Sequence, residues 1–187
     1  MSCMTSYKSF VDKGCDYSHF IHRTKKNERR FEEFYNLIKV PTAIEEKIKK
    51  VDTKIIILSF AENWCSDSVL VLPILERLNE LNTDIQHLII PRDDVLEDFN
   101  VNFLTGGKAK IPFILFLNER FEEVNRWVER SNYTYEKIFE LKEKQLSKVD
   151  FYKAILSLYS SQEIIDATIK ELSDALYRAW LIAKATK

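Results

Sequence analysis

Short apolar runs alternate with amphipathic stretches along the middle of the chain. The runs at 54–60 and 85–90 are continuous and rich in β-branched residues, which is typical of strands buried on both faces. Between them, residues 65–81 carry apolar side chains on one broad face, and this pattern predicts a helix. Two more strands are predicted at 112–117 and 121–128, and the tight turn between them indicates a hairpin.

Helical periodicity dominates both ends of the chain. Pro41 interrupts one such pattern, and Thr42, followed by the acidic Glu45 three residues later, predicts the N-cap of the next helix. The helices expected outside the strand region span roughly residues 7–22, 28–38, 42–51, 93–103, 134–147, 150–160 and 162–184.

The order of these elements predicts an α/β fold. Two strands joined by a helix should run parallel with a right-handed crossover, and the last two strands should pair as a hairpin. The result is a mixed four-stranded sheet with flanking helices, a pattern that several α/β folds share. We expect an N-terminal helical extension at 1–50, a core at 51–132 and C-terminal helices at 133–187 that pack on the core.

Composition narrows the classes of function. The net charge of −1 gives no electrostatic footprint for nucleic acid or an anionic membrane surface, and no apolar run is long enough to span a bilayer. The N-terminus lacks the pattern of a secretory signal, and three cysteines do not make a disulfide scaffold. We therefore expect a cytoplasmic protein with no nucleic-acid or membrane partner.

One cysteine stands out by its position. Cys65 follows Trp64, comes directly after the first predicted strand and opens the next helix. Pro73 lies eight residues after Cys65, and Pro112 lies forty-seven residues after it, at the start of a predicted strand. This arrangement closely resembles the thioredoxin family, in which Trp-Cys-x-x-Cys begins a helix, a proline follows eight residues on, and a cis-proline faces the cysteine.

The resemblance is narrower than the family as a whole. The run 64–68 reads Trp-Cys-Ser-Asp-Ser, and Gly106 and Gly107 precede the pair Ile111–Pro112. It is similar to a bacterial branch of thioredoxin-like proteins with a single-cysteine Trp-Cys-x-Asp-small motif and extra helices on both sides. The resemblance covers roughly residues 50–130 and implies a thioredoxin-like core.

The resemblance implies a role for each motif residue. Cys65 would be the nucleophile, since unpaired N–H groups at a helix N-terminus stabilise a thiolate. Ser68 offers a hydroxyl to the sulfur, whereas the carboxylate of Asp67 disfavours a second negative charge. A cis-Pro112 would leave the backbone of Ile111 free to pair with an extended substrate. Trp64 lines the site.

The departures from the family pattern limit this chemistry. Ser68 stands where the second cysteine would be, and Ser59 replaces the buried acid that dithiol members carry six residues before the first cysteine. A mixed disulfide at Cys65 then has no internal route of release, so a full thioredoxin cycle is not expected. Cys3 or Cys15 would resolve it only if the N-terminal segment folds over the site.

Two functions stay open. The favoured one is a single-thiol (Cys-x-x-Ser) thiol–disulfide redox protein, a possible monothiol oxidoreductase without a cofactor, acting on a thiol- or disulfide-bearing protein or peptide. The alternative is a non-catalytic module that binds a partner through Trp64, Ile111 and Pro112.

Simpler structural roles also stay open for several residues. Asp67 is then a favourable charge in the first turn of a helix, and Ser68 a small packing residue. Cys15, His19 and His22 have helical spacing that suits zinc, but three ligands in a weakly helical segment do not predict a metal site.

Overall fold

The computed structural model describes residues 7–23 and 25–186 and contains one four-stranded sheet in the order β2-β1-β3-β4. β1 runs parallel to β2 and antiparallel to β3, and β3 and β4 form an antiparallel hairpin. The predicted thioredoxin-like α/β class with a mixed four-stranded sheet and flanking helices is confirmed. The strands span Ile55–Ala61 (β1), Ile85–Pro91 (β2), Phe113–Leu117 (β3) and Glu123–Val128 (β4).

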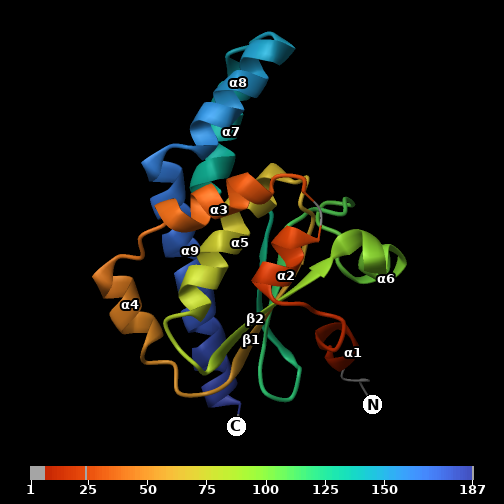
Figure 1. Cartoon of the computed structure of the whole chain (residues 1–187), viewed down its shortest axis with the longest axis vertical. Coiled ribbons are helices and arrows are strands. Elements are labelled where there is room, and N and C mark those ends of the chain that lie inside the picture. The colour runs from red at the N-terminus through yellow and green to blue at the C-terminus, as the bar shows by residue number, and fades with distance from the viewer. Residues whose placement is uncertain (1–6, 24, 187) are drawn as a thin grey trace.

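The helices cover both faces of this sheet (Figure 1). Between β2 and α6 the chain forms a single 3-10 turn, η1, at Arg92–Val95. The α-helices are α1 (Lys8–Val11), α2 (Tyr17–His22), α3 (Glu28–Leu37), α4 (Thr42–Ile48), α5 (Ser66–Asn79), α6 (Leu96–Asn102), α7 (Asn132–Glu143), α8 (Lys148–Tyr159) and α9 (Gln162–Ala185).

Strand β1 lies at the centre of the molecule and is buried along its whole length. Because side chains alternate along a strand, Ile55 and Ile57 pack into the core formed with α2, α3, α5 and α9. Ile56 and Leu58 point to the other face, where α6 and the N-terminal segment cover a cluster of phenylalanines. A strand with apolar side chains on both faces needs this double cover, which explains its continuous hydrophobic run.

The N-terminal region differs from the sequence prediction in two places. Residues 7–22 form two short helices, because Gly14 approaches the Leu88 side chain and Cys15 then exchanges two backbone hydrogen bonds with Ile89 of β2. The predicted Thr42 N-cap is wrong. Pro41, whose backbone is extended, holds the cap position of α4 without a side-chain hydrogen bond, and Thr42 is already helical.

The C-terminal helices have two different placements. The long α9 packs along β4 and α5, and its apolar side chains join the main core. The α7–α8 pair extends beyond the body of the molecule (Figure 1). The predicted division into 1–50, 51–132 and 133–187 stays a prediction. None of the helices in the described part of the chain is long and apolar enough to cross a membrane.

Candidate functional site

The turn between β1 and α5 holds Cys65 at the edge of the sheet. Glu62 and Asn63 in this turn are buried, and each is anchored: Glu62 accepts a hydrogen bond from the Asp93 N–H at 2.8 Å, and the Asn63 side chain donates to the Phe20 carbonyl at 3.1 Å. Cys65 follows as the N-cap of the 14-residue helix α5 and is partly exposed. Its sulfur therefore has a fixed position that a ligand can still reach.

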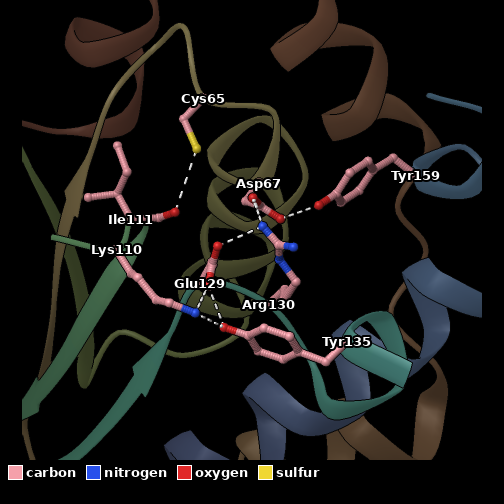
Figure 2. A network of polar contacts seen from close by, with 8 residues as sticks. All are labelled: Cys65, Asp67, Lys110, Ile111, Glu129, Arg130, Tyr135 and Tyr159. Carbon is pink, nitrogen blue, oxygen red and sulfur yellow. Dashed lines mark hydrogen bonds and ion pairs between the residues drawn. The ribbon is translucent and has the colours of Figure 1, made fainter. Parts of the chain in front are cut away.

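The Ile111–Pro112 peptide bond is cis and lies opposite this sulfur. The Cys65 thiol donates to the Ile111 carbonyl oxygen at 3.6 Å (Figure 2). The Pro112 carbonyl accepts from the N–H of Glu129 at 2.8 Å, which fixes this loop to the end of β4. Among the described residues, the N–H of Ile111 has no hydrogen-bond partner.

The surroundings of Cys65 favour the neutral thiol. Burial raises the pKa of Cys65, and the negative charge of Asp67 raises it further. The Ser68 hydroxyl and the backbone N–H groups of Asp67 and Ser68 act in the opposite direction but do not reverse the shift. The stabilisation expected at a helix N-terminus is thus outweighed here by desolvation and by a neighbouring carboxylate.

Asp67 is the centre of a buried polar cluster. One carboxylate oxygen accepts from Arg130 at 2.8 Å, and the other accepts from the hydroxyl of Tyr159 (Figure 2). Burial raises the pKa of Asp67, although both partners oppose this rise. Asp67 lies in the first turn of α5, as the simpler interpretation expects, but it is also enclosed by Tyr159 of α8 and by Arg130 of the segment after β4.

The cluster continues as far as the loop that carries the cis peptide. Glu129 accepts from Arg130 at 2.7 Å and from Lys110 at 2.6 Å, and it also accepts from the hydroxyl of Tyr135. Burial alone would raise the pKa of Glu129, but its contacts with Lys110 and Tyr135 lower it. A chain of charged contacts thereby joins α5, the end of β4 and residue 110 (Figure 2).

These groups line a groove with a volume of about 530 Å³. Four of the predicted site residues reach it, namely Trp64, Cys65, Asp67 and Ile111. Trp64 is 46% exposed, as expected for an aromatic residue at the edge of the site. Ser68 and Pro112 do not line the groove: Ser68 is fully buried, and Pro112 forms the cis peptide bond with Ile111. Helix α7 contributes Phe139, which is 64% exposed, to the lining of the groove.

Two buried side-chain polar atoms in the described chain lack a hydrogen-bond partner, Ser68 Oγ and Arg130 Nε. Both belong to residues of this site. The Ser68 hydroxyl lies close enough to favour a Cys65 thiolate but makes no hydrogen bond of good geometry. Both atoms are closed off from solvent, so neither is open to a ligand in this structure.

The sequence did not reveal Arg130, Tyr159, Glu129 or Lys110 as part of the site. Arg130 and Tyr159 lie 63 and 92 residues from Asp67, so no local motif connects them. The available signal was indirect: a carboxylate next to a half-buried cysteine needs a cationic or hydrogen-bonding partner.

The remaining thiols and histidines lie elsewhere. Cys15 is a free cysteine whose thiol donates a hydrogen bond to the Ile89 carbonyl of β2. His22 contacts Glu28 at 2.7 Å. Cys3 lies outside the described residues. Within the described ranges, no group of three or more His, Cys, Asp or Glu side chains is arranged to hold a metal ion.

A second polar cluster, the Ser59 cluster, joins β1, β2 and α5; its Ser59 and His87 side chains are buried, and Glu76 is partly exposed. Ser59 of β1 lies 3.0 Å from His87 Nε2, and His87 Nδ1 lies 2.9 Å from a Glu76 oxygen. The sequence singled out Ser59 only as the replacement for a buried acid. His87 and Glu76 were not predicted, because their partnership depends on how α5 packs on the sheet.

Comparisons with known proteins agree with this architecture. The chain matches a solved Pseudomonas aeruginosa protein of unknown function with a TM-score of 0.71 and 20% identity, covering 98% of this chain and 100% of that one. It also matches an HIV epitope scaffold with a TM-score of 0.72 and 19% identity, covering 92% and 98% of the two chains. No curated protein matches the chain. The family model described as thioredoxin matches residues 14–145, more than two thirds of the sequence, and the chain therefore belongs to the thioredoxin family.

Proposed function

We propose that this chain binds an extended segment of a protein partner along the Ile111 edge of the Cys65 groove. The observation that carries the proposal is the unpaired N–H of Ile111 beside a thiol that is 3.6 Å from the carbonyl of the same residue. An edge with a free backbone N–H accepts an extended peptide by adding a strand-like hydrogen bond. Trp64 and Phe139, both exposed on this groove, supply apolar contact area.

The state of the thiol favours binding over a redox cycle. The nucleophile in thiol–disulfide exchange is the thiolate, and burial and Asp67 both raise the pKa of Cys65. Ser68 occupies the position of a resolving cysteine, so the motif itself offers a mixed disulfide no internal exit. In this proposal Cys65 is a neutral hydrogen-bond donor at neutral pH.

A second candidate is the monothiol redox function that the sequence favours. Its support is the placement of a partly exposed sulfur at the N-terminus of α5, facing the cis peptide. The Cys65 thiolate would attack a partner disulfide, forming a mixed disulfide and releasing one partner thiolate. A second, external thiol would then have to attack the mixed disulfide to regenerate Cys65.

We include two further assignments in the proposal. We propose that the chain belongs to the bacterial single-cysteine branch of the family, and the Trp-Cys-Ser-Asp-Ser motif at 64–68 supports this assignment. A reducing cytoplasm suits a chain in which Cys15 and Cys65 are both free thiols.

The two candidates differ in a direct binding experiment. Peptides selected from a random ten-residue display library against the immobilised chain are titrated into ¹⁵N-labelled protein. The expected result is that the largest amide shifts fall on Ile111 and Cys65, and that Cys65→Ser binds the same peptides within about twofold.

Two results would contradict the proposal. One is the absence of any peptide that shifts the Ile111 amide. The other is the loss of binding in Cys65→Ser together with a mixed disulfide on the wild-type chain, which would establish the redox candidate instead.

A further inference from the structure

The Cys65 groove carries positive charge that the described chain does not neutralise. Within the groove, Lys110 and Arg130 are balanced by Glu129 and Asp67. Arg92, which lies over the Trp64 ring, is paired with Asp93 at 2.6 Å. The net charge of the groove therefore depends on its two remaining lysines.

Those two residues are Lys108 and Lys142. Both line the groove, both are exposed, and neither has an ion-pair partner among the described residues. The whole chain has a net charge of −1, so this local excess does not reflect a generally basic protein.

The fold places the two lysines on different elements around the same opening. Lys108 follows Gly106 and Gly107, whose positive φ angles of 57° and 70° form the tight turn before the cis peptide. Lys142 lies in the last turn of α7, the helix that also presents Phe139. One segment lying in the groove would meet both ammonium groups and both exposed aromatic side chains.

We infer that the partner segment is acidic: an extended peptide with carboxylates that reach Lys108 and Lys142 and an apolar side chain that packs on Trp64 or Phe139. This inference rests on the proposed function and adds the chemical class of the partner. Unpaired lysines attract carboxylates and disfavour cationic partners, which gives selectivity, while the exposed aromatic residues act as the anchors of the contact.

The test compares three labelled synthetic peptides that differ only in charge. They share one apolar core sequence taken from a binding peptide and carry either Glu and Asp, or Gln and Asn, or Lys at the other positions. Fluorescence anisotropy should give the tightest binding for the acidic peptide, about three- to tenfold weaker binding for the amide peptide, and the weakest for the basic one. Raising the salt concentration should narrow these differences.

Variants of Lys108 and Lys142 test whether the acidic peptide binds beside these two lysines. The double variant K108E/K142E should reverse the order, so that the basic peptide binds better than the acidic one. The control is K50E/K54E, which makes the same change of charge at exposed positions before β1, at the end of that strand remote from Cys65. The control should keep the wild-type order.

The outcomes separate this inference from the proposed function. If acidic and amide peptides bind equally well and still shift the Ile111 amide, peptide binding stands and the acidic partner is wrong. If no peptide of any charge binds, the proposed function itself fails. Binding of glutathione, a small anionic thiol, that depends on Lys108 and Lys142 while all peptides fail would also overturn the inference.

Discussion

Two polar clusters adjoin the same central strand, and they differ in access rather than in the quality of their contacts. Ser59, His87 and Glu76 lie at distances of 3.0 and 2.9 Å, in the serine–base–acid order found in hydrolases. However, Ser59 is 0% exposed, so no substrate can reach its hydroxyl. Cys65 has a raised pKa and contacts no catalytic base among the described residues, yet its sulfur faces an open groove.

The difference shows which features indicate a binding site in this fold. The side chains of the Ser59 cluster pair with one another, which is what buried polar groups require for stability. The groove, in contrast, is bordered by the N–H of Ile111, which has no hydrogen-bond partner among the described residues. A hydrogen-bonding group without a partner at the edge of a groove is available to a ligand. Buried side chains that already pair with one another are not.

The largest expected effect on stability comes from removing Arg130, the cation that pairs with Asp67. Arg130→Ala leaves the Asp67 carboxylate buried with Tyr159 alone, and we expect the free energy of unfolding to fall by about 3 kcal/mol. Urea unfolding followed by circular dichroism measures this change. The double variant D67N/R130M removes both charges and should recover most of the loss; a loss below about 0.5 kcal/mol for Arg130→Ala would show that the ion pair does not support the fold.

Changes in the Ser59 cluster should affect the stability of the chain but not its affinity for peptides. His87→Ala removes both contacts of the imidazole and leaves Ser59 and Glu76 without it, so we expect a loss of about 2 kcal/mol in urea unfolding. Peptide affinity at the groove should stay within about twofold of wild type. Covalent labelling of Ser59 by a fluorophosphonate in the folded chain would contradict the comparison, since it requires access to the hydroxyl.

A smaller effect tests the link between Asp67 and the thiol. Because the carboxylate raises the pKa of Cys65, Asp67→Asn should lower that pKa and make alkylation of Cys65 at pH 7 roughly severalfold faster. Mass spectrometry of the Cys65 peptide measures the rate. Glu136→Gln, an exposed carboxylate on α7, is the matched control and should leave the rate unchanged.

The smallest effect appears in the alkaline stability of the chain. The pKa of Cys65 is higher in the folded state than in the unfolded state, where it is about 8.5, so folding favours the protonated thiol. This contribution is complete below the unfolded pKa and is lost as the pH rises through the folded pKa. Cys65→Ala should therefore lose stability less steeply than wild type above about pH 8.5; equal slopes in urea unfolding would contradict the assigned shift.

Much of the fold follows from the sequence, because it is encoded locally. The buried runs of β1 and β2 and the hairpin turn between β3 and β4 predicted all four strands and the mixed sheet. The structure adds the strand order and shows that β4 begins at Glu123, since Phe121 adopts a positive φ of 62° before the strand. The Thr42 cap was wrong because a cap depends on the backbone of the preceding residue as well as on side-chain type.

The site likewise contains residues that the sequence predicts and residues that only the structure reveals. Trp64, Cys65, Ile111 and Pro112 belong to short motifs, and the resemblance of these motifs to the thioredoxin pattern implied their place in the site. The partners of Asp67 could not, because Arg130 and Tyr159 reach it only after α8 and β4 pack against the core. Sequence reasoning therefore found the thiol and the edge of the groove but not the buried charges that set the state of the thiol.

The rate of Cys65 alkylation as a function of pH tests the central claim most directly. In wild-type protein, with the modified Cys65 peptide quantified by mass spectrometry, we predict a midpoint above the ordinary thiol value of about 8.5. A midpoint below about 7 would show a stabilised thiolate and contradict a groove that holds Cys65 as a neutral thiol.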